Sequence, residues 1–214
     1  MVTPNILAKL GWTTSSIKSS ISEADAESYY QNGLDLKKRG NYRLALEQFK
    51  FAVAGKEGFA EAYLHMGITY VNVGNSRQAI KAFNEALRIN PLFVEAHTEL
   101  ANLYDRDGDF IEAIKIYMKA IQLRPNDVEL RNGLGGVYFN MGAYPEAIKA
   151  YNQAIAIKPK DGRAYFGLGL VYLDLDNMHL LSETCRKLTD IGRRDFASQL
   201  LEKAKTNTKI NPPE

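Results

Sequence analysis

The feature that most constrains this chain is an internal repeat of 34 residues. One small residue stands at each step of a single column, whose members are Gly33, Gly67, Ala101, Gly135 and Gly169. The steps are equal, so no insertion separates the copies. Self-similarity at a fixed period of this length predicts a modest repeat array instead of an ordinary single domain.

Further columns keep the same phase, and each has a structural reason. They comprise turn glycines (Gly40, Gly74, Gly108, Gly142), two alanine columns (Ala45, Ala79, Ala113, Ala147 and Ala52, Ala86, Ala120, Ala154), an aromatic column (Phe49, Phe83, Tyr117, Tyr151) and prolines (Pro91, Pro125, Pro159). Apolar residues at helical spacing predict two helices per copy. The glycine ends the first helix as a C-cap, and the proline ends the second. Asp127 and Asp161 are the expected N-caps of later first helices.

This pattern resembles the tetratricopeptide repeat (TPR), a helix–turn–helix unit of 34 residues. The resemblance implies an all-α fold, an α-α superhelix or TPR solenoid of about five repeats. The repeats are expected at 26–59, 60–93, 94–127 and 128–161, with a degenerate copy at 162–195. An N-terminal tail or linker at 1–25 precedes them. A capping helix at 196–206 and a disordered tail at 207–214 follow.

The degenerate fifth copy departs from the columns at several places. Asp176 replaces the turn glycine, Leu181 and Leu188 replace alanines, and Cys185 replaces the aromatic residue. Larger residues in the small columns predict a wider helix pair, which suits a terminal repeat. Cys185 is expected to be a small residue of the core.

The stretch from Asn132 to Tyr138 reads NGLGGVY, and its glycines are typical of a phosphate-binding loop. The repeat places Gly135 in the small column and the other two glycines beside it inside a helix. No strand precedes them, so the context of a dinucleotide-binding loop is missing. Two explanations remain for Gly133 and Gly136. In the first, which we prefer, the glycines leave room for the backbone of a close-packed ligand. In the second, they are neutral substitutions without a function.

Once the residues are placed in the repeat, no group of them has the arrangement of a catalytic or metal-binding site. Cys185 is the only cysteine, so no internal disulfide or cysteine-based zinc site is available. The histidines (His65, His97 and His179) are scattered, and the aspartates from Asp105 to Asp109 lack the glycine and glutamate of a calcium loop. The sequence therefore predicts a protein that is not an enzyme and needs no cofactor or metal.

Charge and hydropathy exclude two other classes of protein. The net charge is +2, from 27 basic and 25 acidic residues without a basic stripe, so no nucleic acid partner is expected. No apolar run approaches the roughly 20 residues of a transmembrane helix. We expect a cytoplasmic protein. Two alternatives remain, which are peripheral attachment to a membrane or organelle surface and a transit peptide in residues 1–22.

By the resemblance, the first helices line a concave groove, and ligand-facing residues fall at the second, fifth, ninth, twelfth and thirteenth positions of each repeat. The predicted partner-binding residues are Tyr30, Lys37, Leu64, Ile68, Asn72, Asn102, Arg106, Asn132, Phe139, Asn140, Phe166 and Leu170. The amides can pair with a peptide backbone, and the apolar residues can take side chains of an extended peptide or an amphipathic helix. The carboxylate clamp of chaperone adaptors is not predicted, because Tyr30 and Leu34 stand where it needs lysine and asparagine.

The expected function is that of a non-enzymatic adaptor, which binds a partner peptide or helix of another protein in this groove. The alternative is a self-assembling structural scaffold, a homo-oligomer in which residues 1–22 of one copy, with Ile6, Leu7, Leu10 and Trp12, enter the groove of the next. The segment HMGITYVNVG is similar to segments of bacterial organelle-surface scaffolds of this repeat family. A segment of this kind is also close to the general repeat consensus.

Overall fold

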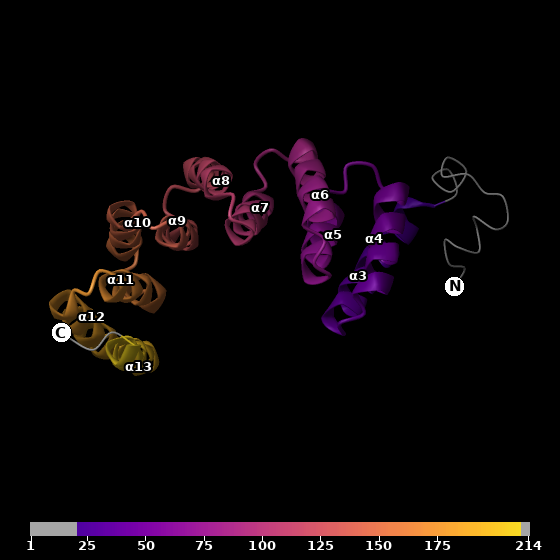
Figure 1. Cartoon of the computed structure of the whole chain (residues 1–214). Helices are drawn as coiled ribbons and strands as arrows, with labels where there is room; N and C mark the ends of the chain where they lie inside the picture. The colour runs from indigo at the N-terminus through magenta and orange to yellow at the C-terminus, as the bar shows by residue number, and fades with distance from the viewer. Residues whose placement is uncertain (1–20, 211–214) are drawn as a thin grey trace. The chain divides into compact units, whose positions relative to one another are not determined.

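The computed structural model describes residues 21–210 and contains helices but no strand within that range (Figure 1). The helices are α3 (Glu23–Lys38), α4 (Tyr42–Gly55), α5 (Ala60–Asn72), α6 (Ser76–Ile89), α7 (Val94–Asp107), α8 (Phe110–Leu123), α9 (Val128–Asn140), α10 (Tyr144–Ile157), α11 (Gly162–Asp174), α12 (Met178–Asp190) and α13 (Arg194–Ile210). The all-α prediction is confirmed. Residues 1–20, which hold most of the predicted docking segment 1–22, lie outside the described range.

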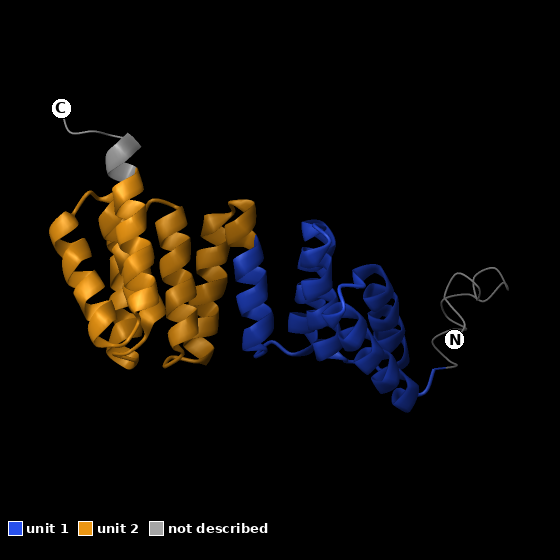
Figure 2. Cartoon of the chain, turned by 90° about the horizontal axis from the view of Figure 1, so that it is seen from below, with its two compact units in different colours: residues 1–103 blue, residues 104–214 orange. Residues whose placement is uncertain are grey.

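The chain divides into two compact units, residues 1–103 and 104–214, and the division falls inside α7 (Figure 2). In unit 1, α3 packs against α4 and α5 against α6, and α4 contacts α5. In unit 2, the pairs are α9 with α10 and α11 with α12, and each pair contacts its neighbours along the chain. Successive helix pairs stacked in this way are the units that the period of the sequence predicts.

The turns between paired helices follow the glycine column. Gly74 has φ 75°, in the left-handed region that a side chain would strain, and it follows the C-cap residue Val73. In the fifth copy the same place holds Asp176 at φ 52°. Among the described residues, it is the single non-glycine residue with a positive φ. Aspartate tolerates this conformation better than most residues, so the turn is kept without glycine.

Small residues of the first helices face aromatic rings of the second helices. A Cβ added at Gly33 would lie 2.6 Å from the Phe49 ring, and one added at Gly67 would lie 2.5 Å from the Phe83 ring. Gly135 stands in the same relation to Tyr151, at 2.7 Å. Real Cβ atoms do not approach so closely, so the paired helices can pack at this separation only if the small column stays small.

The fifth copy fills the same space from a different element. Cys185 is buried, as expected, but the side chain that occupies the space over Gly169 is Leu200 of α13. Leu181, Cys185, Leu188 and Leu200 form one core cluster. The capping helix begins before the expected residue 196 and extends to Ile210, so the tail expected at 207–214 starts inside it.

Candidate functional site

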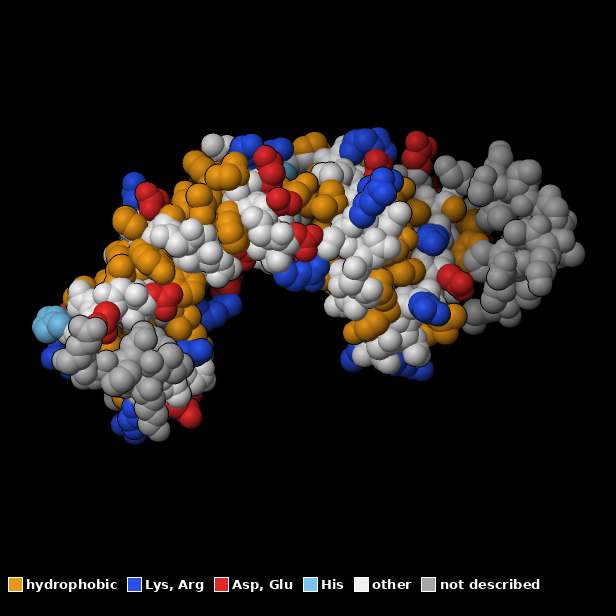
Figure 3. Space-filling model, in the orientation of Figure 1, with side chains coloured by type: hydrophobic (Ala, Val, Ile, Leu, Met, Phe, Trp, Pro, Cys, Tyr) orange, Lys and Arg blue, Asp and Glu red, His pale blue; other side chains and the backbone are white. Residues whose placement is uncertain are grey.

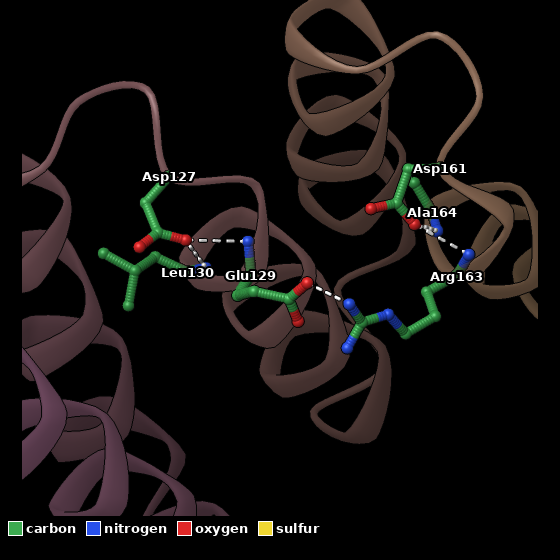
Figure 4. Close-up of polar contacts among 6 residues, drawn as sticks. All are labelled: Asp127, Glu129, Leu130, Asp161, Arg163 and Ala164. Atoms are coloured by element: carbon green, nitrogen blue, oxygen red, sulfur yellow. Dashed lines mark hydrogen bonds and ion pairs between the residues drawn. The ribbon is translucent and has the colours of Figure 1, made fainter.

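The predicted partner-binding residues all come from first helices. Within unit 1, α3 contacts α5, and within unit 2, α11 contacts both α9 and α13, so first helices lie side by side in each unit. We call these surfaces the first-helix face of unit 1 and of unit 2. Ion pairs and N-caps order the start of the helices in unit 2, where Asp127 accepts from the amides of Glu129 and Leu130 (Figure 4). Asp161 caps α11 in the same way, which confirms both predicted caps.

The side chains of these residues differ in exposure. Four are exposed: Asn72, Asn102, Arg106 and Asn140. Seven are half-buried: Tyr30, Lys37, Ile68, Asn132, Phe139, Phe166 and Leu170. The expectation that Leu64 lines the groove is wrong, because its side chain is only 6% exposed. Buried residues of α5 run through Ala62, Leu64 and Met66 to Thr69, so this helix is covered on more than one side.

The asparagines of α9 have two different environments. Asn140 donates from Nδ2 to both carboxylate oxygens of Asp105, at 3.0 Å each. Asn132 has Oδ1 and Nδ2 out of contact with solvent, and neither atom has a hydrogen-bond partner among the described residues. An amide that has lost water without gaining a partner is rare in folded proteins and costs free energy. The Asn132 amide of α9 therefore has a donor and an acceptor that can still form hydrogen bonds.

The glycines beside Asn132 are explained largely by tyrosine rings. A Cβ at Gly133 would collide with the ring and hydroxyl of Tyr117, so the expected ligand backbone is wrong for this glycine. A Cβ at Gly167, the equivalent residue of the fifth copy, would collide with Tyr151. Gly136 differs, because an added Cβ would meet only the Tyr151 hydroxyl, at 3.9 Å. Room for a close approach thus remains at Gly136.

A polar cluster in unit 1 was not predicted from the sequence. Lys37 of α3 donates to His65 Nδ1 of α5 across 3.1 Å, and Glu99 of α7 interacts electrostatically with the same ammonium group. Burial and the Lys37 charge lower the pKa of His65 to about 4, and burial raises the pKa of Glu99. Burial also lowers the pKa of Lys37. Three successive first helices therefore share one half-buried cluster of titratable groups.

This cluster predicts a pH dependence of stability. Above about pH 6.5 His65 is neutral in both states, whereas between there and about pH 4 only the unfolded chain takes up the proton. The free energy of unfolding should therefore fall as the pH drops through this window, by about 1 kcal/mol after allowance for solvent screening. Glu99 opposes the trend, because its raised pKa lets the folded chain take up a proton first.

Urea unfolding at pH 7 and pH 5 measures this effect. The matched variant is His65→Gln, which places the glutamine of the equivalent residue Gln31 at this site and removes the imidazole titration. The loss of stability between the two pH values should be smaller in the variant than in the native chain. An equal loss in both proteins would show that His65 does not titrate as its surroundings indicate.

Other classes of site find little support in the described part of the chain. Residues 21–206 contain no group of three or more His, Cys, Asp or Glu side chains placed to hold a metal ion. Within the described range, each helix is too short or too polar to cross a bilayer. Basic and acidic side chains are interspersed over the face drawn in Figure 3, without a continuous patch of one sign. The asparagines and aromatic residues of the first-helix faces are the remaining candidates.

Comparison with known protein families identifies two matching stretches. A family model described as a tetratricopeptide repeat matches residues 64–128, and one described as a TPR repeat matches residues 137–176. No curated protein matches the chain significantly in sequence.

Solved structures of a protein called MamA are similar in fold. MamA from residue 41 to its end, from Desulfovibrio magneticus RS-1, is 20% identical with a TM-score of 0.70, and the match covers 79% of this chain and 96% of that one. A second MamA crystal structure is 26% identical with a TM-score of 0.63, covering 81% and 96%. A third is 24% identical with a TM-score of 0.64, covering 88% and 96%.

Proposed function

We propose that this chain, whose residues 64–128 and 137–176 match tetratricopeptide-repeat models, acts as a non-enzymatic adaptor that binds an extended segment of a partner protein on the first-helix face of unit 2. Repeats of this kind and the fold shared with MamA support a role in protein interaction or scaffolding. The observation that carries the finer proposal is the buried, unpartnered amide of Asn132.

Asn132 can pair with a partner's main chain at low cost. An amide side chain offers one acceptor and two donors, which match the N–H and C=O of one peptide unit. Both polar atoms of Asn132 are out of contact with solvent, so a partner's main chain reaches them only when this half-buried side chain turns outward, and the hydrogen bonds then gained replace those that the buried amide lacks. An extended main chain leaves such groups unpaired, whereas a helix satisfies its own, so the partner segment is best bound in extended form.

Residues near Asn132 on α9 supply further contacts. Phe139 is half-buried with its ring 6.1 Å from that of Tyr144, so it is held in place and still offers apolar surface. Asp105 fixes the amide of Asn140, which leaves the Asn140 carbonyl oxygen as an oriented acceptor. Gly136 lies between Asn132 and Phe139 in the sequence, and the space beside it admits a close backbone approach. A main chain lying along α9 would meet these groups in turn.

The charged groups at the start of the same helices pair with each other. Glu129 of α9 accepts a hydrogen bond from Arg163 of α11, one repeat further along (Figure 4). Phe166 of α11 packs against Phe196 of α13, with ring centroids 4.9 Å apart, so part of its apolar surface is already covered. Recognition on this face therefore rests on amides and on Phe139, and the partner segment needs no particular charge.

Photo-crosslinking from residue 139 tests the proposal. A photoreactive phenylalanine analogue replaces Phe139, and the matched control carries it at Ile111, an exposed residue of α8 in the same unit. Captured peptides are identified by mass spectrometry. We expect a foreign protein segment at position 139 and not at position 111. Capture of residues 1–22 from another copy would instead establish the self-assembling scaffold.

Asn132→Ala is the accompanying variant. Loss of two hydrogen bonds to a partner should weaken binding on the order of tenfold. The melting temperature should stay level or rise, since the substitution removes a buried polar group without a partner. Unchanged capture from position 139 in this variant would contradict main-chain recognition by Asn132.

A further inference from the structure

The second helix of the first copy, α4, carries an apolar stripe where a preceding repeat would lie. In α6, Ala82 packs into a core cluster with Ala45, Leu46 and Phe49 of α4, so this position faces the copy before it. The equivalent residue of α4 is Gln48, which stands 34 residues earlier. No helix precedes α3 among the described residues. The side of α4 that holds Gln48 is thus the N-terminal end of the described part of the array.

The residues on this side of α4 are not those of a solvated helix. Leu44, Gln48, Phe51 and Gly55 recur at helical spacing and share one side. Leu44 is 50% exposed, whereas Phe51 is 7% exposed and stacks on Tyr29 with ring centroids 4.9 Å apart. Gln48 Oε1 is buried without a hydrogen-bond partner among the described residues. We call these four residues the α4 stripe.

The neighbouring helix α3 shows what an exposed array end looks like. In the second copy, Phe59, Ala62 and Met66 pack against residues of the first copy. The equivalent positions of the first copy hold Asp25, Ser28 and Asn32 of α3, which are exposed and polar. Terminal repeats need such a polar outer side to stay soluble. The first copy therefore meets this requirement on α3 but not on α4.

The chain enters unit 1 at one end of the α4 stripe. A Cβ added at Gly55 would collide with the side chain of Ile21, so Ile21 is seated directly on this glycine. From Gly55 back to Leu44 the helix rises about 16 Å. The stretch of chain from Trp12 to Ile21 can span up to about 30 Å when extended, so the preceding segment is long enough to cover the stripe. The chain from Leu10 to Ile21 contains the apolar residues Leu10, Trp12 and Ile17 and no acidic residue.

We propose that residues 10–17 of the same chain lie along the α4 stripe and cap the N-terminal end of the array. The segment of the same chain is favoured over that of a second copy, because only the former is covalently connected to α4 through Ile21. A short connection gives the segment an effective concentration in the millimolar range, so a modest apolar contact is enough to hold it. A second copy would need that affinity from a stripe whose only largely exposed apolar side chain is Leu44. This cap is independent of the proposed partner site.

The cap has a consequence for assembly. A segment that covers α4 of its own chain is not available to enter a groove of another copy. Release of residues 10–17 from the α4 stripe would then precede any assembly through this segment.

Quenching of the single tryptophan tests the cap. Trp12 is the only tryptophan of the chain, so its fluorescence reports on this segment alone. The full chain carries a nitroxide quencher on Leu44→Cys in a Cys185→Ala background. The matched control carries the quencher on Asn72→Cys, an exposed residue of the first-helix face of unit 1. We expect strong quenching from position 44, little from position 72, and no change on dilution.

Several results would overturn the cap. They are the absence of quenching from position 44, equal quenching from both positions, and quenching that fades on dilution or when labelled chains are mixed with an excess of unlabelled protein. Leu44→Asp supplies a second readout, because it should shift Trp12 emission to that of a water-exposed indole. Emission unchanged by Leu44→Asp would equally contradict a contact with the stripe.

Discussion

Tyr151→Ala is expected to lower the free energy of unfolding by about 3–5 kcal/mol, the usual cost of truncating a large buried aromatic residue. The Tyr151 ring is buried and occupies space over two glycines, Gly135 of α9 and Gly167 of α11. Both glycines lack the side chain that would fill the cavity left behind. Burial and the Asp105 charge raise the pKa of Tyr151 to about 12, so the hydroxyl stays neutral at ordinary pH.

Urea unfolding followed by circular dichroism measures this loss, and two controls define its origin. Tyr151→Phe keeps the ring and should lose far less stability than Tyr151→Ala. Gly167→Ala should destabilise the native chain, because its Cβ collides with the ring, yet be tolerated when Tyr151 is already alanine. The two substitutions should therefore be strongly non-additive. Additive losses would show that the ring does not occupy the space above Gly167.

The contact between each tyrosine ring and a glycine of the next copy was not predicted from the sequence. The aromatic column changes from phenylalanine to tyrosine at Tyr117 and Tyr151. The residue that each ring meets in the next copy is Gly133 or Gly167, whereas Phe49 meets His65. This joint change was present in the sequence as a signal. Columns compared within one repeat do not reveal it, because the contact joins residues of two repeats.

The fold was predictable because helix formation here depends on local spacing. Periodic apolar residues, turn glycines and the caps Asp127 and Asp161 are all local signals, and the structure confirms them. The candidate site was less predictable, since burial depends on what packs from other helices. Leu64 occupied an expected groove position but is covered. The cluster around Lys37 and His65 joins residues up to two repeats apart, and no spacing within one helix indicates it.

The fifth copy shows how the small column can change without loss of packing. At the place of Ala113 it has Leu181, and at the place of the ring of Tyr117 it has Cys185. A larger residue in one column is thus matched by a smaller residue one helical turn later. Leu200 of the capping helix takes the space over Gly169 that a ring fills in other copies. Side-chain volume is conserved across the pair of columns, and not at either column alone.

Ala113→Leu tests this exchange. Ala113 is fully buried on α8, so the additional carbon atoms of a leucine side chain cannot be accommodated beside Tyr117 without strain. We expect a loss of about 1–3 kcal/mol in the free energy of unfolding, measured by urea or thermal melting. Lys119→Leu, on an exposed position of the same helix, is the matched control and should change stability little.

The double variant with Tyr117→Cys decides whether volume exchange is the reason. It reproduces the Leu181 and Cys185 pair of the fifth copy, so it removes the overpacking that Ala113→Leu introduces. Because Tyr117 also covers Gly133, and a cysteine is too small to fill the space of that ring, we expect only partial recovery relative to the sum of the two single losses. A double variant as unstable as that sum would show that the two columns do not share one space. A native melting temperature in Ala113→Leu alone would instead contradict the repeat register that places Ala113 in the core.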